Sequence, residues 1–421
     1  MARLSRSSHL SARASSRLGP IVAACFLLAS VATASTLQVK VAPAKNSGLT
    51  FRPSDPLNDE AFDAFYNLEY DKAVGDFEKI VERHPDDPFA INHLVNALLF
   101  HELNRMGALN SGEYANDSFV GQAHRPADPK VKDRIKQLID HALSLEDAKL
   151  GKNPNDIDTL YARGVTRGQF ALYTALIERA WFSALRNAVG ARHDHERVLE
   201  LSPGYTDAKL IVGSHQYVTG SLPWAVKTAV SLVGLNGSKD KGIQYLYEGA
   251  KSTGETSVDS KIALLLFLRR EHRYDEAIAL SRDLQPRYPK NFLLQLEEGN
   301  LLRAAGRQQQ AAEVYRKVWQ QGSEGKYPRG AHYELSALAL GDLLRSMKNY
   351  AGAAAAYDQM GEVEQPDPEL GQRASLASGE MYDLLNKRDQ AVHRYQAVIA
   401  MNSSTPPAET ARRRLQEPFR E

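Results

Sequence analysis

The residues best suited to chemistry are five consecutive polar ones, Arg192-His193-Asp194-His195-Glu196. Imidazole and carboxylate groups are the usual ligands of Zn²⁺ and the usual groups in acid–base hydrolysis. His193 and His195 are two residues apart, so on a helix they point about 200° away from each other and cannot share one ion. The chain contains no HExxH and no CxxC motif. A polar helix face therefore explains the segment better than a metal-dependent hydrolase, which ranks third among the functions we consider.

Other catalytic patterns fail on their spacing. The run from Gly234 to Lys239 lacks the glycine and lysine spacing of a phosphate-binding loop and follows no predicted strand. No Gly-x-Ser-x-Gly motif is present, and a formal net charge of +1 gives no general attraction for nucleic acid. The sequence therefore predicts no enzyme, no cofactor or metal, no nucleic-acid partner and no small-molecule substrate.

The N-terminus has the pattern of a secretory signal. Residues 1–17 contain four arginines and no acid, and they precede an apolar run that ends in Ala32-Thr33-Ala34. A basic stretch, an apolar stretch and small residues in this order favour export with cleavage after Ala34. The chain would then be periplasmic or outer-membrane-associated if it is bacterial. An uncleaved anchor is the alternative, and so is a lipoprotein modified at Cys25, although an apolar run follows that residue.

One three-residue spacing recurs along the C-terminal third. A glycine is followed by an alanine twelve residues later and by a tyrosine four residues after that. The triplets are Gly299, Ala311 and Tyr315; Gly341, Ala353 and Tyr357; and Gly379, Ala391 and Tyr395; Ala73 and Phe77 form a partial N-terminal version. This spacing predicts two antiparallel helices whose small residues face each other. We expect each tyrosine to fill the groove against the next helix pair.

This pattern resembles the tetratricopeptide repeat family, whose units of about 34 residues are helix-turn-helix hairpins. Ala277 and Ala311 are 34 residues apart, and the resemblance covers roughly Leu57 to Leu415. It implies an all-α fold, a right-handed superhelical solenoid of helix-turn-helix repeats. It further implies a non-enzymatic scaffold for a protein or peptide partner. Together with the export signal, this favours a role in cell-envelope assembly. Such arrays serve many unrelated systems, so no particular target is implied.

A block from Gly220 to Ser252 fits the repeat poorly. With its flanking repeats it resembles the eukaryotic inclusion-body-clearance family of tetratricopeptide proteins, which has a similar apolar segment and glycine turn. Residues 222–235 also carry an apolar stripe that includes Trp224, so the second function we consider is membrane or lipid association through this segment. The polar face has only Lys227 as a basic residue, whereas membrane-surface helices are rich in lysine and arginine.

These patterns divide the chain into six segments. They are a signal peptide at 1–34, a flexible linker at 35–56, irregular N-terminal repeats at 57–219, an irregular amphipathic helical block at 220–256, a C-terminal repeat array at 257–415 and a tail at 416–421. Residues 110–129 are rich in turn formers and predict a long loop inside the repeats.

The predicted binding residues lie one and four positions after each repeat glycine. In tetratricopeptide arrays the first helix of each pair lines the concave face, and residues three apart share one face of a helix. The six residues are Asn300, Arg303, Asp342, Arg345, Glu380 and Asp383. Their mixed charge suits a peptide or protein segment better than a single type of anion. The lysine and asparagine set with which family members clamp a peptide carboxylate is not reproduced.

Overall fold

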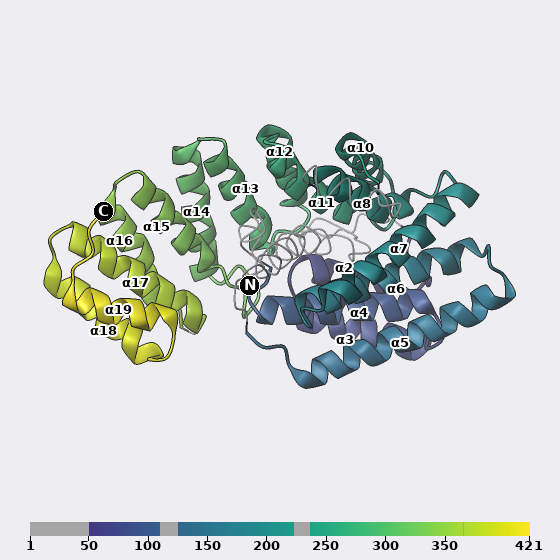
Figure 1. Ribbon diagram of the computed structural model, residues 1–421, viewed down its shortest axis with the longest axis horizontal. Helices are drawn as coiled ribbons and strands as arrows, with labels where there is room; N and C mark the ends of the chain where they lie inside the picture. The colour runs from purple at the N-terminus through teal and green to yellow at the C-terminus, as the bar shows by residue number, and fades with distance from the viewer. Residues whose placement is uncertain (1–49, 110–124, 223–235, 365) are drawn as a thin grey trace, which may run out of the picture. The chain divides into compact units, whose positions relative to one another are not determined.

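The computed structural model describes residues 50–109, 125–222, 236–364 and 366–421, and within these ranges all regular structure is helical (Figure 1). The predicted signal peptide, Cys25, most of the linker and most of the 110–129 loop lie outside the described residues, and so does the Trp224 segment. None of the described helices combines the length and apolar composition that crossing a membrane requires.

The chain forms two compact units, Met1–Leu280 (unit 1) and Ser281–Glu421 (unit 2). The helices of unit 1 are α2 (Asn58–Tyr66), α3 (Tyr70–Arg83), α4 (Pro88–Arg105), α5 (Pro129–Lys152), α6 (Ile157–Leu176), α7 (Trp181–Leu201), α8 (Lys209–Ser221), α10 (Lys239–Ala250) and α11 (Ser257–Arg270). Those of unit 2 are α13 (Phe292–Ala304), α14 (Gln308–Ser323), α15 (Leu335–Ser346), α16 (Tyr350–Asp358), α17 (Pro368–Leu384), α18 (Arg388–Met401) and α19 (Pro406–Gln416), and α12 (Tyr274–Leu284) spans the boundary.

Successive helices pack against each other within each unit, so the predicted all-α solenoid of helix-turn-helix repeats is confirmed at this level. The division between the units differs from the predicted boundary at residue 256. α10 packs against both α8 and α11, and the predicted middle block is therefore part of unit 1.

Prolines and aspartates set the limits of several helices. Pro85, Pro154 and Pro203 each follow a helix by two residues, because proline lacks the amide hydrogen that a continuing helix needs. Asp87 caps α4 through the backbone N–H of Phe89, with proline at the first helical position. An aspartate cap followed by a proline also begins α5 and α17. The cap accepts hydrogen bonds from amide groups that have no partner inside the helix.

The turns within five helix pairs share one geometry. The second residue after the first helix adopts a positive φ, and the next residue donates its N–H to a carbonyl five positions earlier. In the α15–α16 turn, Lys348 has φ 58° and the Asn349 N–H lies 2.9 Å from the Leu344 carbonyl oxygen. The positive-φ residues are Leu68, His272, Gly306, Lys348 and Asn386. This left-handed helix ending fixes the direction in which the second helix leaves.

The Lys348 turn provides a stability prediction. A left-handed conformation costs a residue with a side chain about 1 kcal/mol relative to glycine. We therefore expect Lys348→Gly to raise the free energy of unfolding by about 0.5–1 kcal/mol, and Gly306→Ala to lower it by a similar amount. Urea denaturation followed by circular dichroism measures both changes. A loss of stability in Lys348→Gly would show that the lysine side chain contributes more than the turn geometry.

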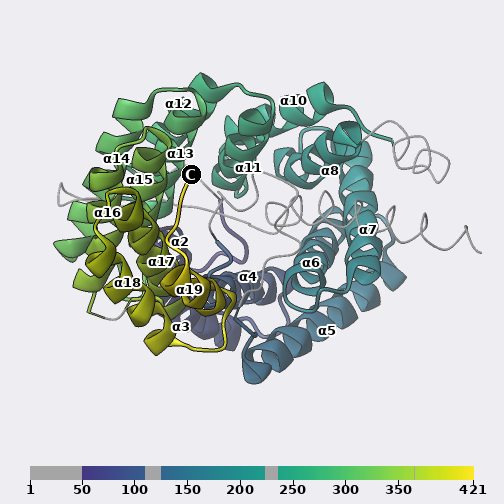
Figure 2. The same cartoon turned by 60° about the vertical axis from the view of Figure 1, so that its left-hand side comes forward.

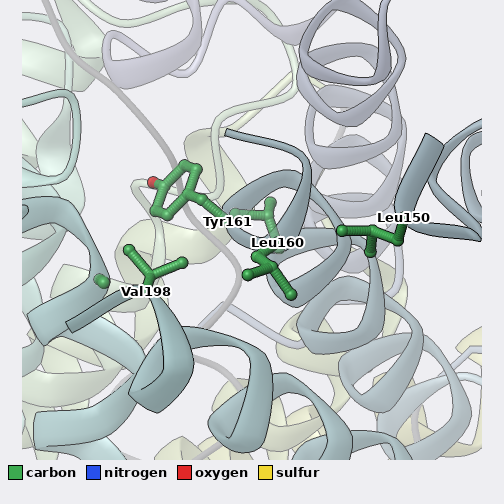
Figure 3. Packing of buried hydrophobic residues seen from close by; sticks show 6 residues of the cluster. Leu150, Leu160, Tyr161 and Val198 are labelled. Atoms are coloured by element: carbon green, nitrogen blue, oxygen red, sulfur yellow. The ribbon is translucent and has the colours of Figure 1, made fainter. Parts of the chain in front are cut away.

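The core of unit 1 is built by side chains from successive helices. Leu150 of α5, Leu160 and Tyr161 of α6 and Val198 of α7 converge in one buried cluster (Figure 3). Burial of side chains of this size contributes about 1.5–3 kcal/mol each. These contacts hold three consecutive helices in register.

Two glycines permit an unusually close crossing of α8 and α10 in unit 1. A Cβ atom added at Gly242 would lie 2.5 Å from the backbone nitrogen of Tyr217 and 2.6 Å from the carbonyl oxygen of Gly213. Both obstacles are backbone atoms, so no side-chain movement can relieve the overlap. The crossing therefore requires glycine at residue 242.

Residues 50–56 differ from the predicted flexible linker, because they pack on unit 1. Phe51 stacks on Phe62 with ring centroids 4.7 Å apart, and Asp55 is 8% exposed. The Asp55 carboxylate accepts hydrogen bonds from Arg83, at 2.8 Å and 2.9 Å. An aromatic ring and a paired carboxylate anchor this segment, whereas its turn-forming residues alone indicate a flexible tether.

Candidate functional site

The repeat triplets form a glycine–tyrosine contact in unit 2. A Cβ atom added at Gly341 would lie 2.3 Å from Cε1 of Tyr357 in the second helix of the same pair. The equivalent distances are 2.4 Å for Gly299 and Tyr315 and 2.6 Å for Gly379 and Tyr395. Each ring therefore lies on the glycine in the first helix of its own pair, in addition to any contact with the next pair that the sequence predicts. The alanines Ala311, Ala353 and Ala391 are fully buried, as are Ala73 and Phe77 in unit 1.

The tyrosine hydroxyl groups engage three of the six predicted binding residues. Tyr315 donates to Asn300 Oδ1 at 2.9 Å and Tyr357 donates to Asp342 Oδ1 at 2.7 Å. Tyr395 instead reaches Asp383 Oδ2, at 2.8 Å. Asn300 and Asp342, which directly follow a repeat glycine, and Asp383, which lies four residues after one, therefore have a structural role that their sequence positions did not reveal.

The other predicted residues differ in their surroundings. Arg303 is exposed on α13. Arg345 of α15 pairs with Glu380 of α17 at 3.0 Å, and Arg414 of α19 approaches the same carboxylate at 3.5 Å. The Arg388 guanidinium donates to both oxygens of Asp383, at 2.9 Å and 3.1 Å. The structure thus gathers Arg345, Glu380 and Asp383 near the C-terminal ends of α15 and α17.

We call this region the polar surface of unit 2. It consists of Arg345, Tyr350, Glu380, Asp383, Arg388 and Arg414, contributed by α15, α16, α17, α18 and α19. The chain that follows α19 runs past α17 toward α15 (Figure 2). Its residue Phe419 donates a backbone N–H to Asp383 Oδ2 at 2.8 Å. The polar surface therefore already holds a short protein segment.

The surroundings shift the pKa values of Arg345 in the polar surface and of Tyr395 beside it. Burial lowers the pKa of Arg345, but the Glu380 and Glu421 carboxylates raise it, and the net result is a raised pKa. Burial, followed by the hydrogen bond to Asp383, raises the pKa of Tyr395 far above its ordinary value. Arg345 therefore stays a cation and Tyr395 stays a hydrogen-bond donor.

The five-residue polar run has a structural role within unit 1. Asp194 is 1% exposed and accepts hydrogen bonds from Arg163 at 2.7 Å and from Arg167 at 2.7 Å. His195 is buried, and its ring lies against Gly164, where an added Cβ atom would be 2.2 Å from Nδ1. Among the described residues no group of three histidine, cysteine or acidic side chains is placed to bind a metal ion.

In the part of unit 1 that the structure describes, a pocket of about 630 Å³ lies between α10 and the start of α12. Its lining mixes both charges, and two of its three acids have partners in the same unit: Glu248 pairs with Lys209 and Glu276 pairs with Arg273. This arrangement offers no concentrated charge to a small ligand.

Sequence reasoning missed a buried polar cluster in unit 1. Arg52 stacks on the Phe89 ring, with its guanidinium carbon 4.2 Å from the ring centroid, and donates its backbone N–H to Glu255 Oε1 at 2.9 Å. Glu255 and His93 are 1% and 2% exposed, and Glu255 Oε2 lies 4.0 Å from His93 Nε2. Arg52 and Glu255 are 203 residues apart in the chain, so no local pattern could have identified the cluster.

This cluster predicts a pH dependence of stability. Burial raises the pKa of Glu255 from its ordinary 4.5 to about 8, and burial lowers that of His93 to about 3. Between pH 4.5 and 8 the folded chain keeps a proton on Glu255 that the unfolded chain has lost, so stability falls as pH rises. His93 has the opposite effect, but only below its unfolded pKa of about 6.5. Each neutral carboxyl group contributes up to about 1.4 kcal/mol per pH unit.

We therefore expect Glu255→Gln to flatten the decline in the free energy of unfolding between pH 6.5 and 8. Burial also raises the pKa of Glu146 to about 8, so Glu146 adds to the same decline in stability. Part of the decline should therefore remain in Glu255→Gln. Urea denaturation at several pH values in this window measures the slope. An identical slope in wild type and Glu255→Gln would mean that Glu255 is ionised in the folded chain.

Two family models match the sequence. The model described as Iml2/Tetratricopeptide repeat protein 39 matches residues 205–360, and a tetratricopeptide repeat model matches residues 63–87. The first match includes the block that resembles the inclusion-body-clearance family. No curated protein sequence matches the chain.

Several solved structures are similar to this chain. A structure reported for the functional characterisation of Pseudomonas aeruginosa pilF is 15% identical with a TM-score of 0.34, covering 59% of this chain and 98% of that one. A human IFIT1 dimer with m7Gppp-AAAA is 12% identical, with a TM-score of 0.38 and coverages of 99% and 86%. A tetratricopeptide repeat protein from Parabacteroides merdae is 13% identical, with a TM-score of 0.31 and coverages of 76% and 97%.

Proposed function

From the premise that the chain is a tetratricopeptide-repeat protein with an Iml2/TPR39-like middle region, as its sequence predicts, we propose that it binds a protein partner through the polar surface of unit 2. Tetratricopeptide arrays are protein-interaction scaffolds, in which stacked helix pairs present one continuous face to another chain. The scaffold is non-enzymatic, and its partner is a peptide segment of another protein.

One observation carries this proposal, namely the protein segment that lies on the polar surface. Asp383 accepts a backbone N–H of the chain after α19, and Arg345 and Tyr350 contact a side chain of the same segment. Main-chain recognition together with a few side-chain contacts is how extended peptides are bound. The surface thus has the geometry and the mixed charge that a peptide partner requires.

We further propose that the protein is exported and acts in the cell envelope. The support is the basic, apolar and small-residue order of residues 1–34. Cleavage after Ala34 gives a mature chain that begins at Ser35. Intact-mass measurement of protein from the envelope fraction checks the position of cleavage. A cytoplasmic chain that retains residues 1–34 would refute export.

Site-specific photo-crosslinking in the native cell tests the scaffold function. A photoreactive residue at Ser346, next to Arg345 and exposed, should capture one partner protein. The matched control is the exposed Ala355 of α16. Capture at Ser346 should be lost with Arg345→Gln while circular dichroism stays unchanged. Capture of the same proteins from both positions, or capture that is insensitive to Arg345→Gln, would contradict a role for the polar surface.

A further inference from the structure

We propose that residues 417–421, the part of the tail that follows α19, occupy the polar surface of unit 2 in competition with the partner. We further propose that the partner segment carries an aromatic residue followed two positions later by an acidic residue. This inference rests on the proposed function and specifies the partner chemistry for the same surface. The tail carries the same residue pattern as the partner segment and binds at the same place.

Two arginines contact the aromatic residue of the tail, Phe419. The guanidinium carbons of Arg345 and Arg414 both lie over the Phe419 ring, at 5.1 Å and 4.6 Å from its centroid. A cation over an aromatic face contributes about 0.5–1 kcal/mol at a partly exposed site. An aliphatic side chain has no such electrostatic term, so the surface favours an aromatic ring.

Arg345 and Tyr350 contact the acidic residue of the tail, Glu421. The Glu421 carboxylate lies 3.3 Å from Nε of Arg345 and accepts the Tyr350 hydroxyl hydrogen at 2.9 Å. In an extended chain residues two apart lie on the same face. Consistent with this, Phe419 and Glu421, on either side of Arg420 in the chain, both contact Arg345. This geometry gives the spacing of two between the aromatic and the acidic residue.

Asp383 binds the main chain of the tail. Its carboxylate accepts the Phe419 N–H at 2.8 Å and is fixed by two hydrogen bonds from Arg388. The carboxylates of Asp383 and Glu380 pair with the arginines, so the surface offers no concentrated positive charge to a phosphate backbone. The surface therefore fits a protein segment rather than a nucleic acid.

The tail is held weakly enough to be displaced. The Arg345 and Glu421 side chains are 30% and 41% exposed, and ion pairs at such sites contribute about 0–1 kcal/mol. α19 ends at Gln416, so the tail contacts described above are made from outside any helix. A competitor binds only the fraction of molecules whose surface is open, which weakens its apparent affinity by that fraction.

Fluorescence anisotropy with the full chain tests this competition. The probe is a fluorescein-labelled, acetylated and amidated peptide with the sequence of residues 415–421, LQEPFRE. We expect the double variant Phe419→Ala/Glu421→Ala to bind the probe about tenfold more tightly than wild type, because its own tail no longer competes. Adding Arg345→Gln should abolish the gain, and a probe with alanine for phenylalanine should bind neither protein.

Equal probe binding by wild type and the double variant, or equal binding of the two probes, would overturn the inference. So would no binding of either probe to a double variant whose circular dichroism spectrum is unchanged. In these cases partner capture at Ser346 would still support the proposed function. Conversely, tail competition without Arg345-dependent partner capture would leave the internal contact established and refute the scaffold function.

Discussion

Gly242→Ala is expected to lower the free energy of unfolding by at least about 3 kcal/mol. The added methyl group would lie 2.5 Å from the backbone nitrogen of Tyr217 and 2.6 Å from the carbonyl oxygen of Gly213. Overpacking of a closely packed core costs about 1–3 kcal/mol where side chains can adjust. Here α8 and α10 must separate as whole helices, so the cost lies at or beyond the upper end of this range.

Gly75→Ala is the matched control for this substitution. Gly75 also lies inside a helix, α3, but an added Cβ atom there would meet no atom within 4 Å. Alanine at this residue should raise the free energy of unfolding by about 0.5–1 kcal/mol through its higher helix propensity. Urea denaturation measures both variants, and hydrogen exchange should locate the loss in Gly242→Ala at α8 and α10. Equal effects of the two substitutions would contradict the close crossing.

Asp194→Ala is expected to lower the free energy of unfolding by about 2–4 kcal/mol. The substitution leaves Arg163 and Arg167 without the buried carboxylate that they share, and removing one partner of a buried ion pair costs about 3–5 kcal/mol. The arginine side chains are 18% and 29% exposed, so water compensates part of this loss. The substitution should therefore loosen the packing of α6 against α7.

Asp147→Ala provides the comparison for Asp194. Asp147 pairs with the same Arg163 at 2.9 Å, but its side chain is 61% exposed. Exposed ion pairs contribute about 0–1 kcal/mol, so this variant should be nearly as stable as wild type. Thermal denaturation of both variants gives the comparison. A small effect of Asp194→Ala, or similar effects of the two variants, would show that burial of the carboxylate adds little.

The repeat spacing predicted the helix pairs because it depends on local geometry. A glycine, an alanine and a tyrosine at fixed offsets constrain one hairpin, and Gly341, Ala353 and Tyr357 are all buried within the α15–α16 pair. The atoms in contact were harder to predict. Whether the Tyr357 ring lies on its own pair or on the next depends on how closely the two helices approach, which three residue types do not determine.

The candidate site was only partly predictable for a related reason. Arg345 and Glu380 were identified from their positions after the repeat glycines, and they form an ion pair in the structure. The tail contacts were not predicted, since Arg345 and Glu421 are 76 residues apart. Asn300 and Asp342 were predicted to line a groove, whereas in the structure each accepts a hydrogen bond from a tyrosine hydroxyl. That contact becomes evident only when the two helices of a pair are packed together.

The central claim is that the polar surface of unit 2 binds a protein segment in place of the tail. Hydrogen-exchange mass spectrometry on the complex with the partner captured at Ser346 tests it most directly. Binding should slow amide exchange in the last turns of α15 and α17 and speed exchange at residues 417–421. Protection confined to unit 1, with exchange of the tail unchanged, would contradict the claim.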